Sequence, residues 1–349
     1  MASTVVHGNP AFPAPDFGNL RSEFEALLSS CGVYDLSVRT RIALTGGDRV
    51  RWLNGMVTNN VRDLPVGHGL YAFLLNPQGH ILGDMYAYNR GDSLMIDTDQ
   101  SQLERLLATF DHYIIMDDVE VTNLSDKLTA IGIAGPKVRD VLSSAGFEIL
   151  QLEPLQFADM TWQNVAVTVV RGDNTSVESY ELWLSPDQTT LFHNALGNAG
   201  ATPVGPTVLE LLRIAAGVPR YGKDIRERDL PQETEQQRAL HFSKGCYIGQ
   251  EIVERIRSRG NVHRHLRSLE LDGPLAEPGT RLTLEGAEAG HITSAAELPL
   301  PGGVRRFAIG MIRAEAEARN LPLNYSVGEI SGVANVLAVP PYLTPGMER

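Results

Sequence analysis

Two tight turns in the first third of the chain limit what it can fold into. Residues 69–99 alternate between apolar and polar positions, and this alternation is interrupted at 76–79 (NPQG) and 89–92 (NRGD). Asn, Pro, Gly and Asp reverse a chain within a few positions, and turns this short join antiparallel strands. The alternating strands and helices farther along would also fit a parallel sheet, but parallel strands need long crossover connections. The turns therefore favour an α+β fold with antiparallel sheets.

The pattern changes near residue 264. Before it, segments at helical and strand spacing alternate; one of them, 101–114, is predicted to be a helix with Ser101 as its N-cap. After Arg264 the segments are short, alternate in polarity and are separated by Gly and Pro, which is typical of a small β-barrel or sandwich. We expect two α+β lobes, whose boundaries can be discontinuous, and a C-terminal β-barrel domain: roughly 1–118, 119–262 and 263–349.

Composition excludes several classes of protein. The formal net charge of −12 disfavours broad nucleic-acid binding. The chain contains no run of 18 apolar residues, so no membrane span is predicted. The N-terminus lacks the basic and apolar regions of a secretory signal, and Pro10, Pro13 and Pro15 predict an irregular arm there. The only cysteines, Cys31 and Cys246, give no disulfide framework. We therefore expect a cytoplasmic monomer with no membrane contact and no strong nucleic-acid binding.

One of the two cysteines lies in the distinctive stretch KGCYIGQE at 244–251. Apolar residues follow from Tyr247 at helical spacing, so Cys246 is expected at or just before a helix N-terminus, with Lys244 two residues away. The N-terminal dipole and a nearby cation both favour a thiolate, which makes Cys246 a candidate nucleophile. The other reading is a small apolar residue at a helix start. The motif alone leaves both readings open.

KGCYIGQE and the following VERIRSRGNVHRHL resemble the signature of the YgfZ-type folate-binding proteins. These are paralogues of the aminomethyltransferase (T-protein) of the glycine cleavage system. Further stretches match in the family's order: GVYDLSVRTRIALTGGDRVRWLNGMVTNNV, LLNPQGHILGDM, RGDNTSVESYEL, ELLRIAAGVPRYGKDIRERDLPQE and GHITSAAE. The resemblance implies an aminomethyltransferase-like fold over 1–262 with a central channel for tetrahydrofolate, or for a one-carbon-substituted or polyglutamylated folate. We expect Glu181 and residues of the 71–88 hairpin to line this cavity. It also implies a role in iron–sulfur cluster assembly or repair, with iron–sulfur client or assembly proteins as transient partners.

The resemblance assigns roles to single residues. Glu181 matches the carboxylate that holds the pterin's amino-pyrimidine edge, Arg213 matches an arginine able to bind the carboxylates of the folate tail, and Asp84 matches an acid that assists one-carbon transfer. Cys246 and Lys244 join Asp84 as catalytic candidates, and no metal site is expected. Other residues are implied in binding folate: Asn76, Arg171, Gly245, Tyr247, Gln250 and Glu251.

Two departures from the T-protein pattern bear on activity. Gly83 stands where T-proteins have the first acid of a pair, and the stretch RGDNTSVES lacks three glycines of its T-protein counterpart. The resemblance therefore favours a folate-binding accessory factor for iron–sulfur proteins over glycine cleavage. A folate-dependent one-carbon transferase or demethylase remains the alternative, and a redox thiol protein with a decayed folate site is a third reading.

Overall fold

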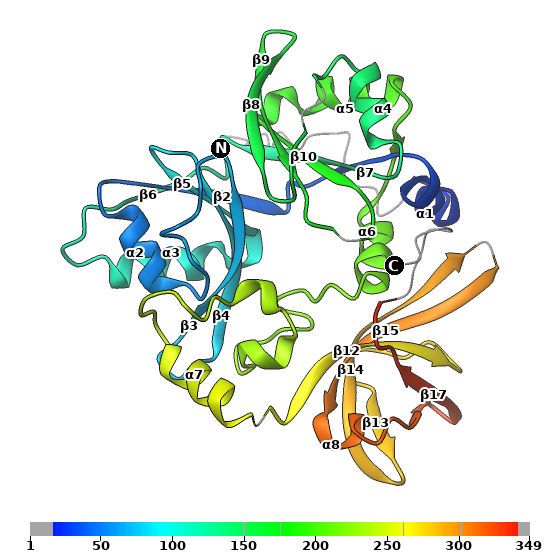
Figure 1. The fold of residues 1–349 in the computed structure, drawn as a ribbon. Coiled ribbons are helices and arrows are strands. Elements are labelled where there is room, and N and C mark those ends of the chain that lie inside the picture. Colours follow the sequence, from blue (N-terminus) through cyan, green and yellow to red (C-terminus); the bar gives the residue numbers. More distant parts are fainter. Residues whose placement is uncertain (1–16, 149–150, 175, 261, 301, 341–349) are drawn as a thin grey trace, which may run out of the picture.

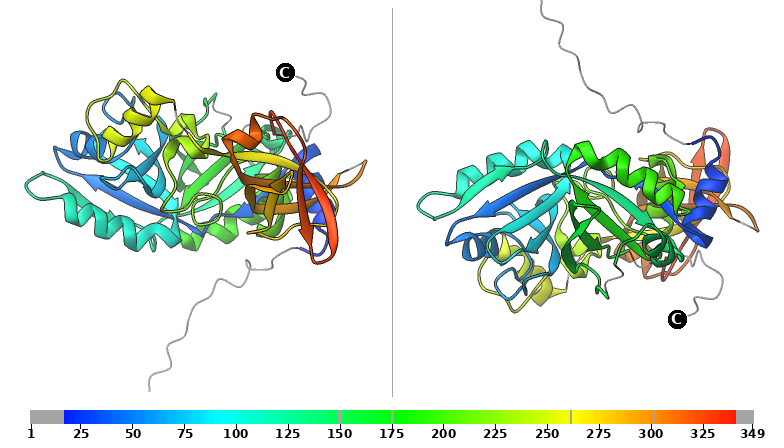
Figure 2. Two further views of the ribbon diagram at one scale, coloured as in Figure 1. Left: turned by 90° about the horizontal axis from the view of Figure 1, so that it is seen from below. Right: turned by 90° about the horizontal axis from the view of Figure 1, so that it is seen from above.

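The computed structural model describes residues 17–148, 151–174, 176–260, 262–300 and 302–340, so the predicted N-terminal arm lies outside the described residues. Three units, two open sheets with their helices and one closed barrel, surround the centre of the molecule (Figure 1). Seen from above or below, they follow one another along a flattened molecule (Figure 2). None of the helices in the described part of the chain is long and apolar enough to cross a membrane.

The first sheet has five strands in the order β3-β4-β5-β2-β6, and all its pairings are antiparallel. Its strands are β2 (Arg39–Thr45), β3 (Gly69–Leu75), β4 (Ile81–Asn89), β5 (Leu94–Asp99) and β6 (Glu120–Asn123). Helices α2 (Arg49–Met56) and α3 (Leu103–Tyr113) bury Leu53 and Phe110 against it. The NPQG turn closes the β3–β4 hairpin as predicted, with Asn76 N–H donating to His80 O at 2.9 Å.

The second sheet has six strands in the order β11-β1-β7-β10-β9-β8. Its strands are β1 (Gly32–Asp35), β7 (Thr129–Ala134), β8 (Phe157–Trp162), β9 (Val165–Arg171), β10 (Ser179–Leu184) and β11 (Thr202–Pro203). Only the β1–β11 pair is parallel. Helices α4 (Val138–Ser144) and α5 (Thr189–Asn198) pack on it through a cluster that includes Leu142 and Phe192. The antiparallel α+β prediction is confirmed for both sheets.

The chain crosses between the two sheets early. Helix α1 (Leu20–Ser29) and β1 lie with the second sheet, whereas β2, only three residues after β1, belongs to the first. Strand β6 returns to the first sheet before β7 re-enters the second. The two lobes are therefore discontinuous in sequence, and the crossing at 36–38 lies between them.

The C-terminal unit is a closed antiparallel barrel in the order β12-β15-β14-β13-β16-β17, which confirms the predicted β-barrel. Its strands are β12 (Arg264–Asp272), β13 (Arg281–Leu284), β14 (Ala287–Leu300), β15 (Gly303–Arg313), β16 (Leu323–Val327) and β17 (Ile330–Val336). The one helix among the described residues of this unit, α8 (Ala314–Glu317), is a single turn. Helix α6 (Pro206–Ala215) packs on β14 and joins the barrel to the lobes.

Two predicted helix starts were wrong. Asp99, the last residue of β5, has an extended backbone and accepts a hydrogen bond from Ser101 N–H at 3.0 Å, so Asp99 rather than Ser101 caps the 3₁₀ turn that leads into α3. Helix α7 (Gln250–Arg259) begins four residues after Cys246, because its N-cap Gly249 has a φ of +82°. A left-handed residue cannot continue a helix toward the N-terminus.

Candidate functional site

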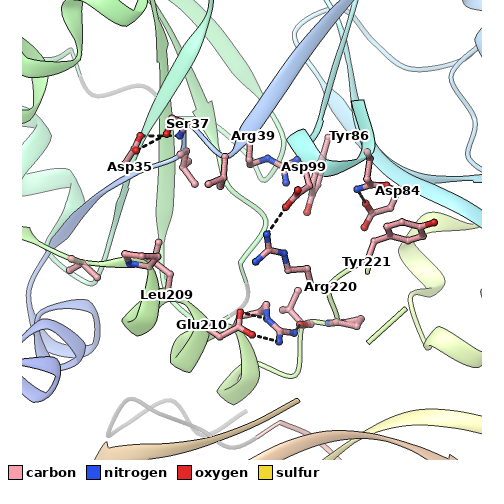
Figure 3. Close-up of a pocket in the computed structure, with 18 of the residues that line it drawn as sticks. Asp35, Ser37, Arg39, Asp84, Tyr86, Asp99, Leu209, Glu210, Arg220 and Tyr221 are labelled. Carbon is pink, nitrogen blue, oxygen red and sulfur yellow. Dashed lines mark hydrogen bonds and ion pairs between the residues drawn. The ribbon is translucent and has the colours of Figure 1, made fainter. Parts of the chain in front are cut away.

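A cavity of about 500 Å³ lies where the two lobes and α6 meet. One wall comes from the 36–38 crossing and the first turn of α6, with Leu36, Val38 and Leu209 as apolar contacts. The opposite wall comes from the β3–β4 hairpin, with Tyr86 (Figure 3) and with Tyr71, its partner across the hairpin. The cavity is therefore apolar at one end and aromatic at the other, and its volume lies in the range of small-molecule sites.

Asp84 is held from two sides at the aromatic end. Tyr71 Oη donates to its Oδ2 at 2.7 Å, and Gln102 Nε2 donates to its Oδ1 at 2.7 Å. Asp84 N–H donates in return to Gln102 Oε1 at 2.9 Å. A Cβ on the neighbouring Gly83 would lie 2.8 Å from Gln102 Oε1. Gln102 therefore occupies the space of the missing first acid, and both oxygens of the remaining acid already accept a hydrogen bond.

Four arginines line the cavity, balanced by four carboxylates, and the arginines differ in how fully they are paired. Arg39 donates from Nε and Nη2 to Asp97, which raises the pKa of Arg39 although burial opposes it. Arg238 lies over the Tyr71 ring at 4.5 Å and pairs with Asp173. The other two are Arg213 and Arg220.

Arg213, the predicted partner of the folate tail, has all five N–H groups engaged. Nε and Nη2 donate to Glu210 at 2.9 and 2.8 Å, and Nη1 donates to Val218 O and Asp224 Oδ2 at 2.7 and 2.6 Å. The remaining Nη2 donor meets Ser294 Oγ of the barrel at 2.9 Å. A guanidinium has five donors in total, so Arg213 reaches a ligand only by breaking one of these bonds. In this arrangement Arg213 ties α6 to the barrel.

Glu181 and Arg171 are not among the residues that line the cavity. Glu181 accepts from Trp183 Nε1 at 2.8 Å and lies 3.5 Å from the buried Arg41 guanidinium, with 22% of its side chain exposed. Burial, and then the charge of Asp97, raise the pKa of Glu181, although Arg41 and Arg39 act in the opposite direction. Its other oxygen, Oε1, has no hydrogen-bond partner among the described residues. Arg171 pairs with Glu178 instead.

Lys244 is a buried anchor at the C-terminal end of α2. Its ammonium donates to the carbonyl oxygens of Asn54, Val57 and Asn59 at 2.5, 2.6 and 2.7 Å, which uses all three of its N–H groups. Burial lowers the pKa of Lys244 to about 7, with a smaller contribution from the Arg62 guanidinium, whereas the carbonyl contacts favour the charged form. The last carbonyls of a helix lack partners within the helix, and a cation there is stabilising. Lys244 therefore has no donor left for the Cys246 thiol.

The remainder of KGCYIGQE fixes the same segment at its other end. Ile248 N–H donates to Gly55 O of α2 at 3.1 Å. A Cβ on Gly249 would lie 2.6 Å from Asn76 O, and a Cβ on Gly79 would lie 2.7 Å from Ile252 Cβ. Only glycines let the α7 N-terminus and the NPQG turn approach this closely. The motif therefore caps α2 and docks α7 on the β3–β4 hairpin.

The two cysteines differ sharply in exposure. Cys246 is exposed, midway between the anchored Lys244 and Ile248, and it is not among the residues that line the cavity. Cys31 is fully buried, and burial raises the pKa of its thiol to about 12.

The other residues predicted to bind folate lie in KGCYIGQE or beside it, and none of them lines the cavity. Tyr247 lies with its ring 5.0 Å from Lys244 Nζ, and Gln250 Oε1 accepts from Tyr247 N–H at 3.2 Å. Glu251 is exposed and pairs with Arg255 at 2.7 Å, while Asn76 Oδ1 accepts from His80 N–H at 2.9 Å. Gly245 has open space around it.

Of the other cavity residues, Tyr71 and Tyr86 lie in the 71–88 hairpin that was expected to line the cavity, although neither was singled out, and Gln102, Arg220 and Arg238 were missed at the sequence level. The sequence of the hairpin contains a signal for Tyr71 and Tyr86. Positions 84 and 86 alternate onto one face of β4, and the tight turn sets Tyr71 opposite Tyr86. No sequence pattern marks Gln102, Arg220 or Arg238, which reach the cavity from three separate segments.

Two α+β lobes and a closed barrel around a central cavity define an aminomethyltransferase-like fold. The chain belongs to the family described as the GCVT N-terminal domain, whose sequence profile matches residues 10–244. It is 27% identical over 305 residues to an aminomethyltransferase of Rubrobacter xylanophilus, covering 86% of this chain and 81% of the relative. It is 25% identical to an aminomethyltransferase of Staphylococcus haemolyticus, covering 88% and 86%. The glycine cleavage system aminomethyltransferase T from Bartonella henselae has the same fold, with a TM-score of 0.83, 19% identity, and 93% and 90% of the two chains covered.

Proposed function

We propose that this chain binds tetrahydrofolate in the central cavity and serves as an accessory factor in iron–sulfur cluster assembly or repair, with Cys246 as its reactive group. The match to the GCVT N-terminal domain family supports the folate part, and the resemblance of KGCYIGQE to the YgfZ-type signature supports the iron–sulfur part. The exposed thiol of Cys246 supports its role. A single cysteine does not hold a cluster, since four ligands are the norm, so contact with iron or sulfur would be transient or shared with a partner protein.

The cavity suits a reduced folate in size and chemistry. Its volume of about 500 Å³ matches a ligand of this class, and the Tyr71 and Tyr86 rings offer a surface for the flat pterin. Glu181 lies outside the cavity lining, beside Arg41, and its free Oε1 would accept from the pterin's amino groups where the ring extends past that lining. Bound folate would supply a carrier for one-carbon units. The residues of this chain orient it and limit access of water.

The observation that carries the choice of an accessory role is the state of Asp84. Both its oxygens accept hydrogen bonds from Tyr71 and Gln102, and Gln102 fills the space beside Gly83. Each oxygen of Asp84 is thus held by a neighbouring side chain and keeps one acceptor position for a donor of a ligand. This arrangement suits a binding site better than a group-transfer site.

A folate-dependent one-carbon transferase or demethylase is the second candidate. It is favoured by the position of Asp84 in the cavity wall and by the aminomethyltransferase relatives. The purified protein, incubated with a methylated amine and tetrahydrofolate, is expected to form no 5,10-methylenetetrahydrofolate above the protein-free rate. Turnover that disappears in Asp84→Asn would establish the transferase instead.

Folate binding is tested by calorimetry with wild-type protein and Glu181→Gln. The glutamine keeps an acceptor for Trp183 but turns an amide group toward the pterin's own donors, so we expect the binding free energy to weaken by about 2–3 kcal/mol. Glu153→Gln, at an exposed position, is the matched control. Unchanged affinity in Glu181→Gln removes Glu181 from the site, and no binding to wild-type protein refutes the folate proposal.

The iron–sulfur role is tested in cells that lack the native protein. Cys246→Ser is expected to leave folding and folate binding intact but to abolish support of iron–sulfur enzymes, whereas Ser243→Ala, exposed on the same segment, is expected to support them fully. Full support by Cys246→Ser would exclude the thiol from the function.

A further inference from the structure

Arg220 is the cavity arginine with unused donors. Its Nη2 donates to Asp99 Oδ2 at 2.6 Å, and its Nε and Nη1 have no hydrogen-bond partner among the described residues. The side chain is 41% exposed and reaches across the middle of the cavity toward Asp99 (Figure 3). Arg213, in contrast, has all five of its N–H donors engaged.

The backbone at Arg220 is fixed although its side chain is free. Arg220 N–H donates to the buried Asp224 at 3.0 Å, and its carbonyl oxygen accepts from Asp224 N–H at 2.9 Å and from Lys223 N–H at 3.2 Å. Asp224 is itself held by Thr293 and Ser294 of the barrel. A fixed backbone under a guanidinium with free donors is pre-organised for a planar, bidentate partner such as a carboxylate.

Arg220 also stands where the cavity meets a second hollow. A groove of about 770 Å³ runs between α6 and β14, and it shares Pro206, Glu210 and Arg220 with the cavity. Lys223 and Arg226 line this groove, and the Arg226 side chain hydrogen-bonds only the Lys223 carbonyl oxygen among the described residues. Two acids line the groove: Glu210 is paired with Arg213 and Lys223, and Glu297 is paired with Arg306. A path with available cations therefore leads out of the cavity past Arg220.

We propose that Arg220 binds the carboxylate at the end of the cavity ligand, and that the tail of this ligand leaves along the groove toward Lys223 and Arg226. This inference rests on the proposed folate function. It orients the ligand with its ring system against the neighbouring rings of Tyr71 and Tyr86 and its anionic tail at Arg220. Arg220 can keep its bond to Asp99 in the bound state, because that bond uses one N–H of Nη2, and the second N–H of Nη2 forms a fork for a carboxylate together with Nε or Nη1.

The test compares two probes. Tetrahydrofolate carries the carboxylate tail, and 6-methyltetrahydropterin has the same ring system without it. Arg220→Gln is expected to weaken tetrahydrofolate about 10- to 100-fold and to change 6-methyltetrahydropterin less than twofold, since a charge-assisted contact is lost only with the tail. Arg228→Gln, exposed eight residues later and absent from the lining of the cavity and groove, is the matched control and should change neither.

The outcomes separate the two proposals. Equal losses for both probes, or no loss for either, overturn the role of Arg220 and leave the folate proposal standing. Failure of wild-type protein to bind either probe refutes the folate proposal itself. For the groove, tetrahydrofolate triglutamate is expected to bind wild-type protein several-fold more tightly than the monoglutamate, and Lys223→Gln with Arg226→Gln should remove that gain. Equal affinity of the two folates for wild-type protein overturns the exit along the groove.

Discussion

The segment Lys244–Gln250 and the central cavity are held in place in different ways. The segment is fixed by a few contacts with backbone: Lys244 binds three carbonyls in and just after the last turn of α2, Ile248 binds the Gly55 carbonyl, and Gly249 packs against Asn76. The cavity is lined by charges with several partners each, such as Arg213 and Glu210. When a side chain that binds backbone carbonyls is replaced, no other group satisfies those carbonyls. When one member of a shared ion-pair network is replaced, the remaining charges still have partners. Single substitutions should therefore lower the free energy of unfolding strongly in the segment and weakly in the cavity.

The largest expected effect concerns the thiol that the segment presents. Burial raises the pKa of Cys31 from 9.0 to about 12, which lowers its thiolate fraction about a thousandfold at neutral pH, and Cys246 is exposed. Iodoacetamide at pH 7.5 should alkylate Cys246 at least a thousandfold faster than Cys31, as measured by mass spectrometry of labelled peptides. Comparable rates in the folded protein would contradict this picture, and equal rates in urea are the control.

Lys244→Met should cause the next largest loss. The methionine keeps the apolar stem but leaves the carbonyls of Asn54, Val57 and Asn59 without their shared donor, which we expect to lower the free energy of unfolding by about 3 kcal/mol. Urea denaturation gives the value. Lys127→Met, at an exposed position, should change it by less than about 0.5 kcal/mol. A loss no greater than this control would show that the lysine does not anchor the segment.

Gly249→Ala isolates the docking of α7 on the hairpin. The alanine must adopt a φ of +82° and place its Cβ 2.6 Å from Asn76 O, so a loss of about 2–3 kcal/mol in stability is expected. Gly260→Ala is the matched control, since Gly260 has a φ of +69° with no atom within 4 Å of an added Cβ; it should cost about 1 kcal/mol. If urea denaturation shows equal losses of stability for Gly249→Ala and Gly260→Ala, the positive φ alone, without close packing against Asn76, explains why position 249 requires glycine.

The smallest effect is expected in the cavity, at Glu210. Burial opposes its charge, but Arg213 and Lys223 outweigh burial and lower the pKa of Glu210 from 4.5 to about 2. The unfolded chain then binds this proton more readily, so the stabilisation is complete above about pH 5 and is lost as the pH falls toward 2. Because 27% of the side chain is exposed, Glu210→Gln should lower the free energy of unfolding at pH 7 by only about 1–2 kcal/mol.

The pH dependence supplies the check on Glu210. Denaturation of both proteins at several pH values should show the difference shrinking to zero near pH 2. A cost at pH 7 larger than that of Lys244→Met would reverse the comparison between segment and cavity.

Much of the fold followed from local sequence. The NPQG turn, the alternation of β3 and β4 and the short Gly- and Pro-separated strands after Arg264 depend on neighbouring residues, and the antiparallel sheets and the barrel agree with them. The helix starts at Asp99 and Gly249 were misjudged, because a cap depends on backbone angles that residue type only favours.

The sequence by itself determined the antiparallel α+β class, the all-β character of the C-terminal unit and the position of a distinctive motif, since each is written in consecutive residues. The pairing of β12 with the distant β17 decided that this unit closes into a barrel. Tertiary structure alone decided what the motif does to its neighbours and which residues line the cavity. Lys244 meets carbonyls some 190 positions away, and Asp99 and Arg220 are 121 positions apart. Which donors an arginine has left, as at Arg213 and Arg220, depends on every neighbour in space. The physical reason is that hydrogen bonds saturate, and saturation is a property of the folded surroundings and not of the residue type.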